Sequence, residues 1–380
     1  MSFAESPPAD QDDLEIFRRS VSRFLADEMR PRAEGWRRNR IIDRASWTAM
    51  AEMGLLGVGL PETWGGSGGD IRHEAILLEE VEKFVPEMGP SLAVHSHIVA
   101  HYFLTFGTEA QKARYLPKLT SGEFIGAIAM TEPGTGSDLR AIRTAATRSG
   151  NGWQISGQKT FISNGINADV VITACQTDAG LSLMLVETEG TRGYSRGRHL
   201  EKIGHDASDT SELFFDAVEV GPDAVLGGEE GRGLSQLMAQ LPRERLSIAI
   251  SAVAALRKAL ELTISYTSDR QAFGKPLIDN QHVAFELADL KTEVFVAEAM
   301  LARCIDLAAR GQLDTVTASM AKYWSTEKLG SLLDRCLQLH GGNGFMKEFE
   351  IARMYVDARV LRIYGGTSEI MRMIIARSLR

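Results

Sequence analysis

The feature that most constrains this chain is a run of apolar residues in its last third, repeating every three or four positions over several turns. This period matches one turn of an α-helix, so the run predicts a single long helix with one apolar stripe. The stripe consists of Val283, Leu287, Leu290, Val294, Ala297, Leu301 and Ile305. Because such a stripe must be buried against other helices, residues 234–380 are expected to form a bundle of four long helices.

A different period marks the middle of the chain, from about Ala127 to Gly233. Short apolar or alternating runs are separated there by Gly, Asn and Asp, which is typical of strands and turns. Strands are expected at Trp153–Ile162, Val170–Ala174, Leu181–Val186 and Glu212–Val220. No long helical segment fits, so residues 127–233 are predicted to form a β-barrel-like domain. No GxGxxG follows a strand, which argues against a Rossmann dinucleotide site.

The first third, residues 1–126, again has helical periodicity, as in Leu14, Phe17, Val21, Phe24 and Leu25. The predicted fold class is therefore α+β, with an N-terminal helical domain, a middle β-domain and a C-terminal four-helix bundle.

Three histidines lie close together in this first third: His95, His97 and His101. Two histidines four apart on a helix are able to share a metal ion, but no carboxylate or cysteine completes a ligand set. We therefore interpret the histidines as part of a core or a pocket wall and predict no metal site.

The composition limits the classes of partner. The chain has 380 residues, a formal net charge of −8 and 44% hydrophobic residues, so nucleic acid is not expected as its main partner. Cys175, Cys304 and Cys336 are too far apart for a CxxC metal site and odd in number, so no disulfide framework is expected. No apolar run is long enough for a membrane span. These features favour a soluble protein in the cytoplasm.

The segment Arg362–Arg380 (RIYGGTSEIMRMIIARSLR) has a pattern that suits a binding site. Gly365 and Gly366 lack side chains that would keep a ligand from the backbone. Thr367 or Ser368 would cap the following helix. A helix start behind a glycine pair is able to hold an anion or a carbonyl oxygen on its N–H groups. Taken alone, the segment fits an ordinary loop-to-helix turn better than a binding site.

Five sequence blocks, taken together, resemble the acyl-CoA dehydrogenase family. They are MTEPGTGSD (Met130–Asp138), GQKTFISNG (Gly157–Gly165), DRQAFGKPL (Asp269–Leu277), QLHGGNGF (Gln338–Phe345) and IYGGTSEI (Ile363–Ile370). The resemblance implies an FAD-dependent enzyme that oxidises the Cα–Cβ bond of an acyl-CoA to give a trans-2-enoyl-CoA. It also implies a homotetramer, a dimer of dimers, that passes electrons to an electron-transferring flavoprotein.

One residue departs from the pattern of many members, in which a catalytic glutamate occupies the position of Gly365. In the long-chain and isovaleryl-CoA dehydrogenase branch, the base lies instead on a helix of the third domain. Glu244, in LPRERL, matches that helix. The resemblance therefore implies that Glu244 is the base and that Arg245 lies near the thioester. From the residues alone, Glu244 also fits a first-turn glutamate of a helix that begins at Pro242, or a partner of an arginine.

The resemblance assigns the remaining site residues position by position. The N–H of Gly365, with Gly366 beside it, would hold the thioester carbonyl together with a ribityl hydroxyl of the flavin. Ser137 would lie between flavin and substrate. The flavin ring would contact Met130, Thr131, Phe161, Ile162 and Ser163. The adenosine half would lie at a subunit boundary, between Thr367 and Glu369 and a second group formed by Arg270, Phe273, Gln281, Gln338, Gly341 and Gly342.

Two questions stay open at this level. An oxidase, a flavin monooxygenase or a lyase is able to share the same fold, and a non-catalytic acyl-CoA- or flavin-binding protein is a further alternative in which Glu244 is structural. The acyl chain is not specified either. Gly89-Pro90 interrupts a helical region and would open the acyl tunnel, which favours a longer or bulkier acyl group.

Overall fold

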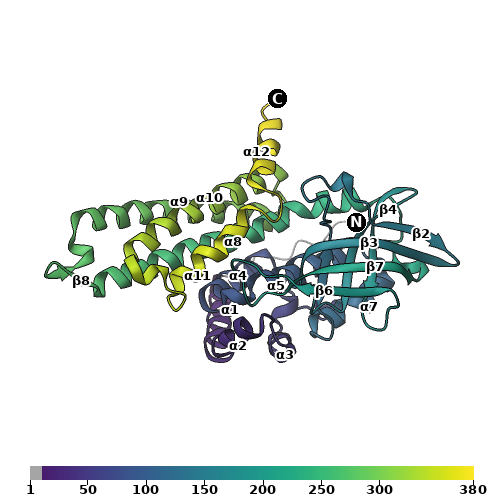
Figure 1. Ribbon diagram of the computed structural model, residues 1–380, viewed down its shortest axis with the longest axis horizontal. Coiled ribbons are helices and arrows are strands. Elements are labelled where there is room, and N and C mark those ends of the chain that lie inside the picture. The colour runs from purple at the N-terminus through teal and green to yellow at the C-terminus, as the bar shows by residue number, and fades with distance from the viewer. Residues whose placement is uncertain (1–10) are drawn as a thin grey trace.

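The computed structural model describes residues 11–380 and contains three regions, a helical one, a β-sheet and a second helical one, which are seen in Figure 1. The first region is helical. Its helices are α1 (Gln11–Phe24), α2 (Ala33–Asn39), α3 (Arg44–Glu52), α4 (Ile71–Phe84), α5 (Gly89–Leu92), α6 (Ala100–Phe106) and α7 (Glu109–Thr120). Within residues 11–380 no helix is long and apolar enough to cross a membrane.

The amphipathic pattern of the first helices accounts for their packing. Val21 and Leu25 are buried, and Phe17 and Phe24 pack against the same core. His95, His97 and His101 are also buried. His95 accepts a hydrogen bond from the N–H of Gly126 (3.0 Å), which ties it to the start of the sheet.

The middle region is a seven-stranded sheet of mostly antiparallel strands in the order β1-β4-β2-β3-β7-β6, with β5 paired to β4. Its strands are β1 (Gly126–Ala129), β2 (Ala145–Ser149), β3 (Gly152–Ser163), β4 (Val170–Thr177), β5 (Gly180–Glu187), β6 (Tyr194–His199) and β7 (Thr210–Val220). All four predicted strands are present. The other three strands were not predicted from the sequence, because β2 and β6 are short and largely polar and β1 has only four residues.

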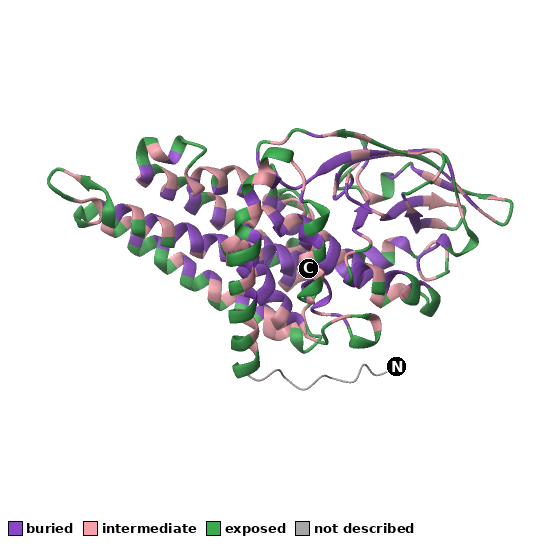
Figure 2. Cartoon of the chain, turned by 90° about the horizontal axis from the view of Figure 1, so that it is seen from below, coloured by how far each residue is buried: buried purple, intermediate pink, exposed green. Residues whose placement is uncertain are grey.

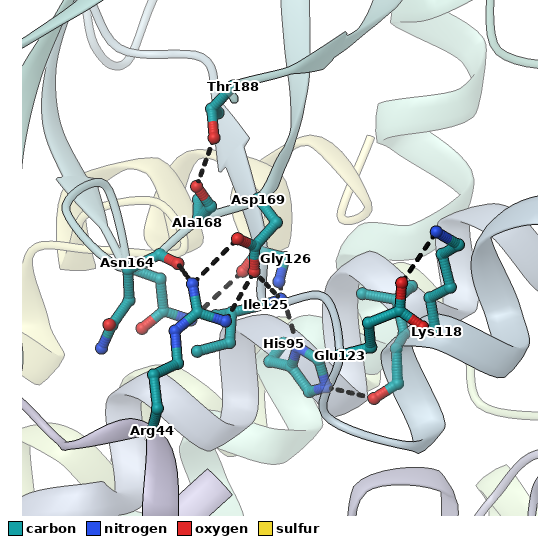
Figure 3. A network of polar contacts seen from close by, with 12 residues as sticks. Arg44, His95, Lys118, Glu123, Ile125, Gly126, Asn164, Ala168, Asp169 and Thr188 are labelled. Atoms are coloured by element: carbon teal, nitrogen blue, oxygen red, sulfur yellow. Dashed lines mark hydrogen bonds and ion pairs between the residues drawn. The ribbon is translucent and has the colours of Figure 1, made fainter. Parts of the chain in front are cut away.

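A polar network joins this sheet to the N-terminal helices (Figure 3). Arg44 of α3 donates two hydrogen bonds to the carboxylate of Asp169, at 2.7 and 2.9 Å. The same carboxylate accepts a hydrogen bond from the N–H of Ile125 (2.7 Å), at the entrance to β1. Charge-assisted bonds of this kind are directional, so the network fixes how the helices lie against the sheet.

The last region is a helical bundle that contains the predicted stripe. Its helices are α8 (Gly233–Asp269), α9 (Gln281–Ala309), α10 (Thr315–His340), α11 (Glu350–Asp357) and α12 (Ser368–Arg377), and a small hairpin of β8 (Gln271–Ala272) and β9 (Lys275–Pro276) joins α8 to α9. The stripe residues of α9 are buried, except Ile305, which is partly buried. The prediction of four long helices was wrong in detail. Three are long, because glycine-rich and irregular segments interrupt the chain after His340.

The chain changes from helices to strands between Thr120 and Gly126, and from strands back to long helices between Val220 and Gly233. The α+β class and its three-part order are confirmed. The domain bounds 1–126, 127–233 and 234–380 stay a prediction.

A buried ion pair fixes β3 to the segment that follows β1. Lys159 has a completely buried side chain, and its Nζ donates to Glu132 Oε1 (2.9 Å) and to the carbonyl of Met130 (3.1 Å). Glu132 also accepts hydrogen bonds from the N–H groups of Arg143 and Thr144, and these contacts hold its pKa at about 2 although burial alone would raise it. The pair therefore determines how residues 130–132 lie beside β3.

We expect Lys159→Met to lower the free energy of unfolding by about 3 to 5 kcal/mol, because it leaves the Glu132 carboxylate buried without its cation. Urea denaturation at pH 7 measures the change. Lys118→Met is the control, since Lys118 and Glu123 form an exposed pair, for which about 0 to 1 kcal/mol is expected. Equal losses in the two variants would contradict this account of the β-domain.

Candidate functional site

Glu244 lies in the interior of α8 and is only 5% exposed. The helix begins at Gly233 and continues through Pro242, so the alternative of a first-turn glutamate is wrong. The hydroxyl of Tyr102, on α6, donates a hydrogen bond to Glu244 Oε1 (3.0 Å). Burial raises the pKa of Glu244 to about 7, although the Tyr102 hydrogen bond and the charge of Arg245 oppose the increase. A carboxylate with this pKa is able to take and release a proton near neutral pH.

The two arginines beside Glu244 have separate partners. Arg245 is buried, and its Nη1 donates to Ser319 Oγ of α10 (3.2 Å). Arg243 forms an ion pair with Glu74 of α4, and His101 lies 2.8 Å from the same carboxylate. Consecutive residues of α6 thus hold consecutive residues of α8: His101 contacts Arg243, and Tyr102 contacts Glu244.

The glycine pair forms the second side of the site. Gly365 and Gly366 have φ values of 65° and 92°, in the region that favours glycine. Thr367 caps α12, since its Oγ1 accepts a hydrogen bond from the N–H of Ile370 (3.3 Å). A β-carbon at Gly365 would overlap the Cδ1 of Ile248. Ile248 lies one turn beyond Glu244 on α8, so the glycine turn and Glu244 lie along the same helix face.

A third set of groups lies at the end of β3. The pairing of β3 with β7 shifts between Lys159 and Ile162, which marks a bulge. Within it Phe161 has a φ of 59° and is 68% exposed. Bulges re-aim side chains next to functional sites, and an exposed ring here is able to cover a planar molecule. The N–H of Thr160 donates to the carbonyl of Thr131 (2.9 Å), so the segment with Met130 lies alongside.

The predicted residues around Phe161 differ in how much of each is accessible to a ligand. The side chain of Ile162 is buried in the core of the sheet, so only its backbone is available to a ligand. Ser163 is half-buried, and Ser137 is exposed on the turn after β1.

Glu369 lies in the first turn of α12, and the other predicted residues form a separate, exposed group at the far end of the bundle, where β8 lies in Figure 1. Figure 2 shows the same tip of the molecule as exposed. This group consists of Arg270, Phe273, Gln281, Gln338, Gly341 and Gly342, and Phe273 is 98% exposed. Along α10, Gln338 lies 16 residues beyond Lys322, which contacts the glycine turn. Sixteen residues of helix span about 24 Å. A single chain therefore does not bring the two groups together.

Two side chains of the site were missed by the sequence analysis. Tyr102 contacts Glu244, and Lys322 of α10 donates to the carbonyl of Gly366 (2.6 Å). Neither belongs to a motif, and each contacts a residue far along the chain, so no local pattern marks them.

Comparison with known proteins matches three successive parts of the chain to one family. The family model described as "Acyl-CoA dehydrogenase, N-terminal domain" matches residues 11–123. The models for the middle domain and the C-terminal domain of the same family match residues 127–218 and 231–380.

Individual relatives match over almost the whole chain. The mitochondrial long-chain specific acyl-CoA dehydrogenase of Rattus norvegicus is 44% identical over 372 residues, which cover 96% of this chain and 86% of that protein. A crystal structure of an acyl-CoA dehydrogenase from Geobacillus kaustophilus has a TM-score of 0.95 and 41% identity, covering 98% and 99% of the two chains. A glutaryl-CoA dehydrogenase from Mycobacterium smegmatis in complex with FADH2 has a TM-score of 0.92 and 29% identity, covering 98% and 95%.

The geometry around Glu244 predicts its titration. The infrared difference between wild type and Glu244→Gln isolates the C=O band of the protonated Glu244 carboxyl group. This band should disappear as the pH rises through about 7. In Tyr102→Phe the ionised form loses its hydrogen-bond donor, so the band should persist to higher pH by about one unit. Tyr115→Phe is the control, because Tyr115 donates to Glu187 instead. A band that disappears near pH 4.5 in the wild type would contradict the assignment.

Proposed function

The chain belongs to the acyl-CoA dehydrogenase family, and on this premise we propose that Glu244 is the base that removes the α-proton of its acyl-CoA substrate. Family membership makes the protein an FAD-dependent oxidoreductase. The observation that carries the proposal is the burial of Glu244 with a pKa of about 7, on a helix face that also meets the Gly365 turn. Gly365 itself carries no carboxylate that would compete for the proton.

The Gly365 turn supports the second part of the mechanism. As the α-proton leaves, negative charge builds on the thioester oxygen and needs a donor in place before the reaction starts. The backbone at Gly365 is free of a side chain, and Gly366 beside it leads directly into the capped start of α12. We propose that the N–H of Gly365 holds this oxygen, and that Arg245 lies close to the thioester.

The groups on the β-domain suit the cofactor. FAD supplies the acceptor for the β-hydride when it is bound. The exposed ring of Phe161, held in a bulge, fits one face of a flat ring system, and the neighbouring backbone of residues 130–131 and 162–163 offers donors and acceptors at its edge. Exclusion of water by these residues would strengthen the electrostatic interactions of the base.

We also propose how the subunits assemble, because the exposed group around Arg270 (the far-end group) is too far from the glycine turn to serve the same FAD within one chain. In this proposal Arg270, Phe273 and Gln338 of one subunit contact the adenosine half of the FAD held by another subunit. Thr367 and Glu369 of that second subunit, beside its glycine turn, form the near-end group of the same site. Phe285 and Phe295 of α9 are 62% and 71% exposed, which favours contact with further copies of the chain. A homotetramer arranged as a dimer of dimers satisfies both observations.

Substrate length and electron acceptor are also proposals. The expectation that Gly89-Pro90 interrupts a helix was wrong, because the two residues begin α5, which continues without a break through a π-helix from Ala93 to Val99 into α6. The likeness to a long-chain specific dehydrogenase favours a longer acyl group. We propose an electron-transferring flavoprotein as acceptor. The three buried, free cysteines favour a reducing compartment such as the cytoplasm.

Glu244→Gln should slow α-proton removal strongly while leaving FAD bound. Under anaerobic conditions, mixing the wild type with long-chain acyl-CoA should bleach the flavin absorbance, and the variant should bleach about 10² to 10⁴ times more slowly. Glu261→Gln, at an exposed position on the same helix, is the control. Equal bleaching in wild type and Glu244→Gln would place the base elsewhere.

The shared cofactor site predicts complementation between two variants. Arg270→Ala impairs the far-end group, and Thr367→Pro impairs the near-end group, so each alone should retain little FAD. In a mixed dimer one site combines the intact near end of one chain with the intact far end of the other. Co-expression of differently tagged chains, followed by double affinity purification, should recover FAD-containing protein. Mixed oligomers without FAD would contradict a site shared between subunits.

A further inference from the structure

Lys322 is a buried cation that the proposed mechanism leaves without a role. Its side chain is completely buried in α10, and its Nζ donates a hydrogen bond to the carbonyl of Gly366 (2.6 Å). Gly366 directly follows Gly365, the residue whose N–H would hold the thioester oxygen. The contact joins two segments that are 44 residues apart in the sequence.

The charge of Lys322 is not neutralised by a direct partner. Among residues 11–380, no carboxylate lies within ion-pair distance of its Nζ. The charged groups that act on it from the surrounding helices are Arg245 of α8, Glu327 of α10 itself and Glu369 of α12. Glu327 already accepts hydrogen bonds from Ser368 and Arg362. Burial and the neighbouring Arg245 lower the pKa of Lys322 to about 8, so it is still largely protonated at pH 7.

Such an arrangement is unfavourable for stability alone. An unpaired ammonium group out of water costs free energy, and a neutral side chain of similar length would avoid that cost. Its charge becomes favourable when negative charge develops nearby. Within the described part of the chain, the only hydrogen bond of the Lys322 Nζ leads to the turn where that charge is expected.

We propose that Lys322 is a positioning residue of the carbonyl-binding turn: it fixes the Gly365–Gly366 backbone and stabilises, through it, the negative charge on the thioester oxygen. This inference rests on the function proposed above. When the α C–H bond breaks, the proton passes to Glu244 and the electron pair moves onto the thioester oxygen. A fixed positive charge behind the turn favours that ionised state over the neutral substrate.

A ligand that ionises without further reaction separates this role from catalysis. In a 3-thia-acyl-CoA, sulfur replaces the β-carbon, so the α-proton can pass to Glu244 but no β-hydride is available. The resulting enolate next to oxidised flavin absorbs at long wavelength, and this band titrates with pH. Its apparent pKa belongs to the ligand and Glu244 together, and loss of a stabilising charge should raise it.

The experiment compares purified FAD-containing wild type with Lys322→Gln, Lys322→Met and Lys322→Arg. We expect the apparent pKa to rise by about one unit, a tenfold change in ionisation, in the Gln and Met variants. The Arg variant, which keeps the charge, should stay closer to the wild type. Lys328→Met is the control, because Lys328 lies on the same helix but pairs with Glu293.

The outcomes are distinguishable. A wild-type titration that is unchanged in Lys322→Gln and Lys322→Met would overturn the role of Lys322 and leave the proposed function intact. A wild type that never forms the band would overturn both. Failure of all three Lys322 variants to fold would make the residue structural and would also overturn the proposal.

Discussion

A carboxylate that is buried with a single hydrogen-bond donor dominates the energetics of this site. Removing Glu244 from water disfavours its charged form, and the Tyr102 hydroxyl restores only part of the lost solvation. The surrounding structure keeps this unfavourable group in place. Pro242 lies just before it in a helix that continues unbroken, and the contact of Arg243 with Glu74 anchors that helix to α4. The fold thus holds the carboxylate where its basicity is high.

Two cations near Glu244 are also buried at a cost in free energy. Arg245 and Lys322 are both buried, and neither forms a direct ion pair among the residues that the structure describes. Lys322 donates to the carbonyl of Gly366 in the glycine turn, where negative charge would appear nearby during the proposed reaction, and the charge of Arg245 acts on Lys322 from α8. Two buried cations without an ion-pair partner are unfavourable while the substrate is neutral, and they become favourable as negative charge develops in the transition state. This is the condition for catalysis by electrostatic preorganisation.

Much of this architecture follows from local sequence patterns, and the remainder depends on contacts between distant residues. The apolar stripe of α9, four strands of the sheet (β3, β4, β5 and β7) and the glycine turn before α12 each have a short-range signature, and all are present. Glu244 was identified by resemblance, since its own surroundings in the sequence fit an ordinary helix start. Tyr102 and Lys322 could not be predicted from local patterns, because each belongs to the site only through a contact with a distant residue. Tyr102 lies 142 residues from Glu244 in the sequence, and Lys322 lies 44 residues from Gly366. The polar strands β2 and β6 were missed because they lack apolar alternation.

The central claim is that Glu244 acts as a base whose pKa is raised by burial, and the pH dependence of a single turnover tests it most directly. The rate of anaerobic flavin bleaching by a saturating long-chain acyl-CoA should be measured by stopped flow between pH 5 and 9. Because the base must be ionised to accept the proton, we expect the rate to rise with pH and to reach half its maximum near pH 7. A rate that is constant across this range would contradict the account.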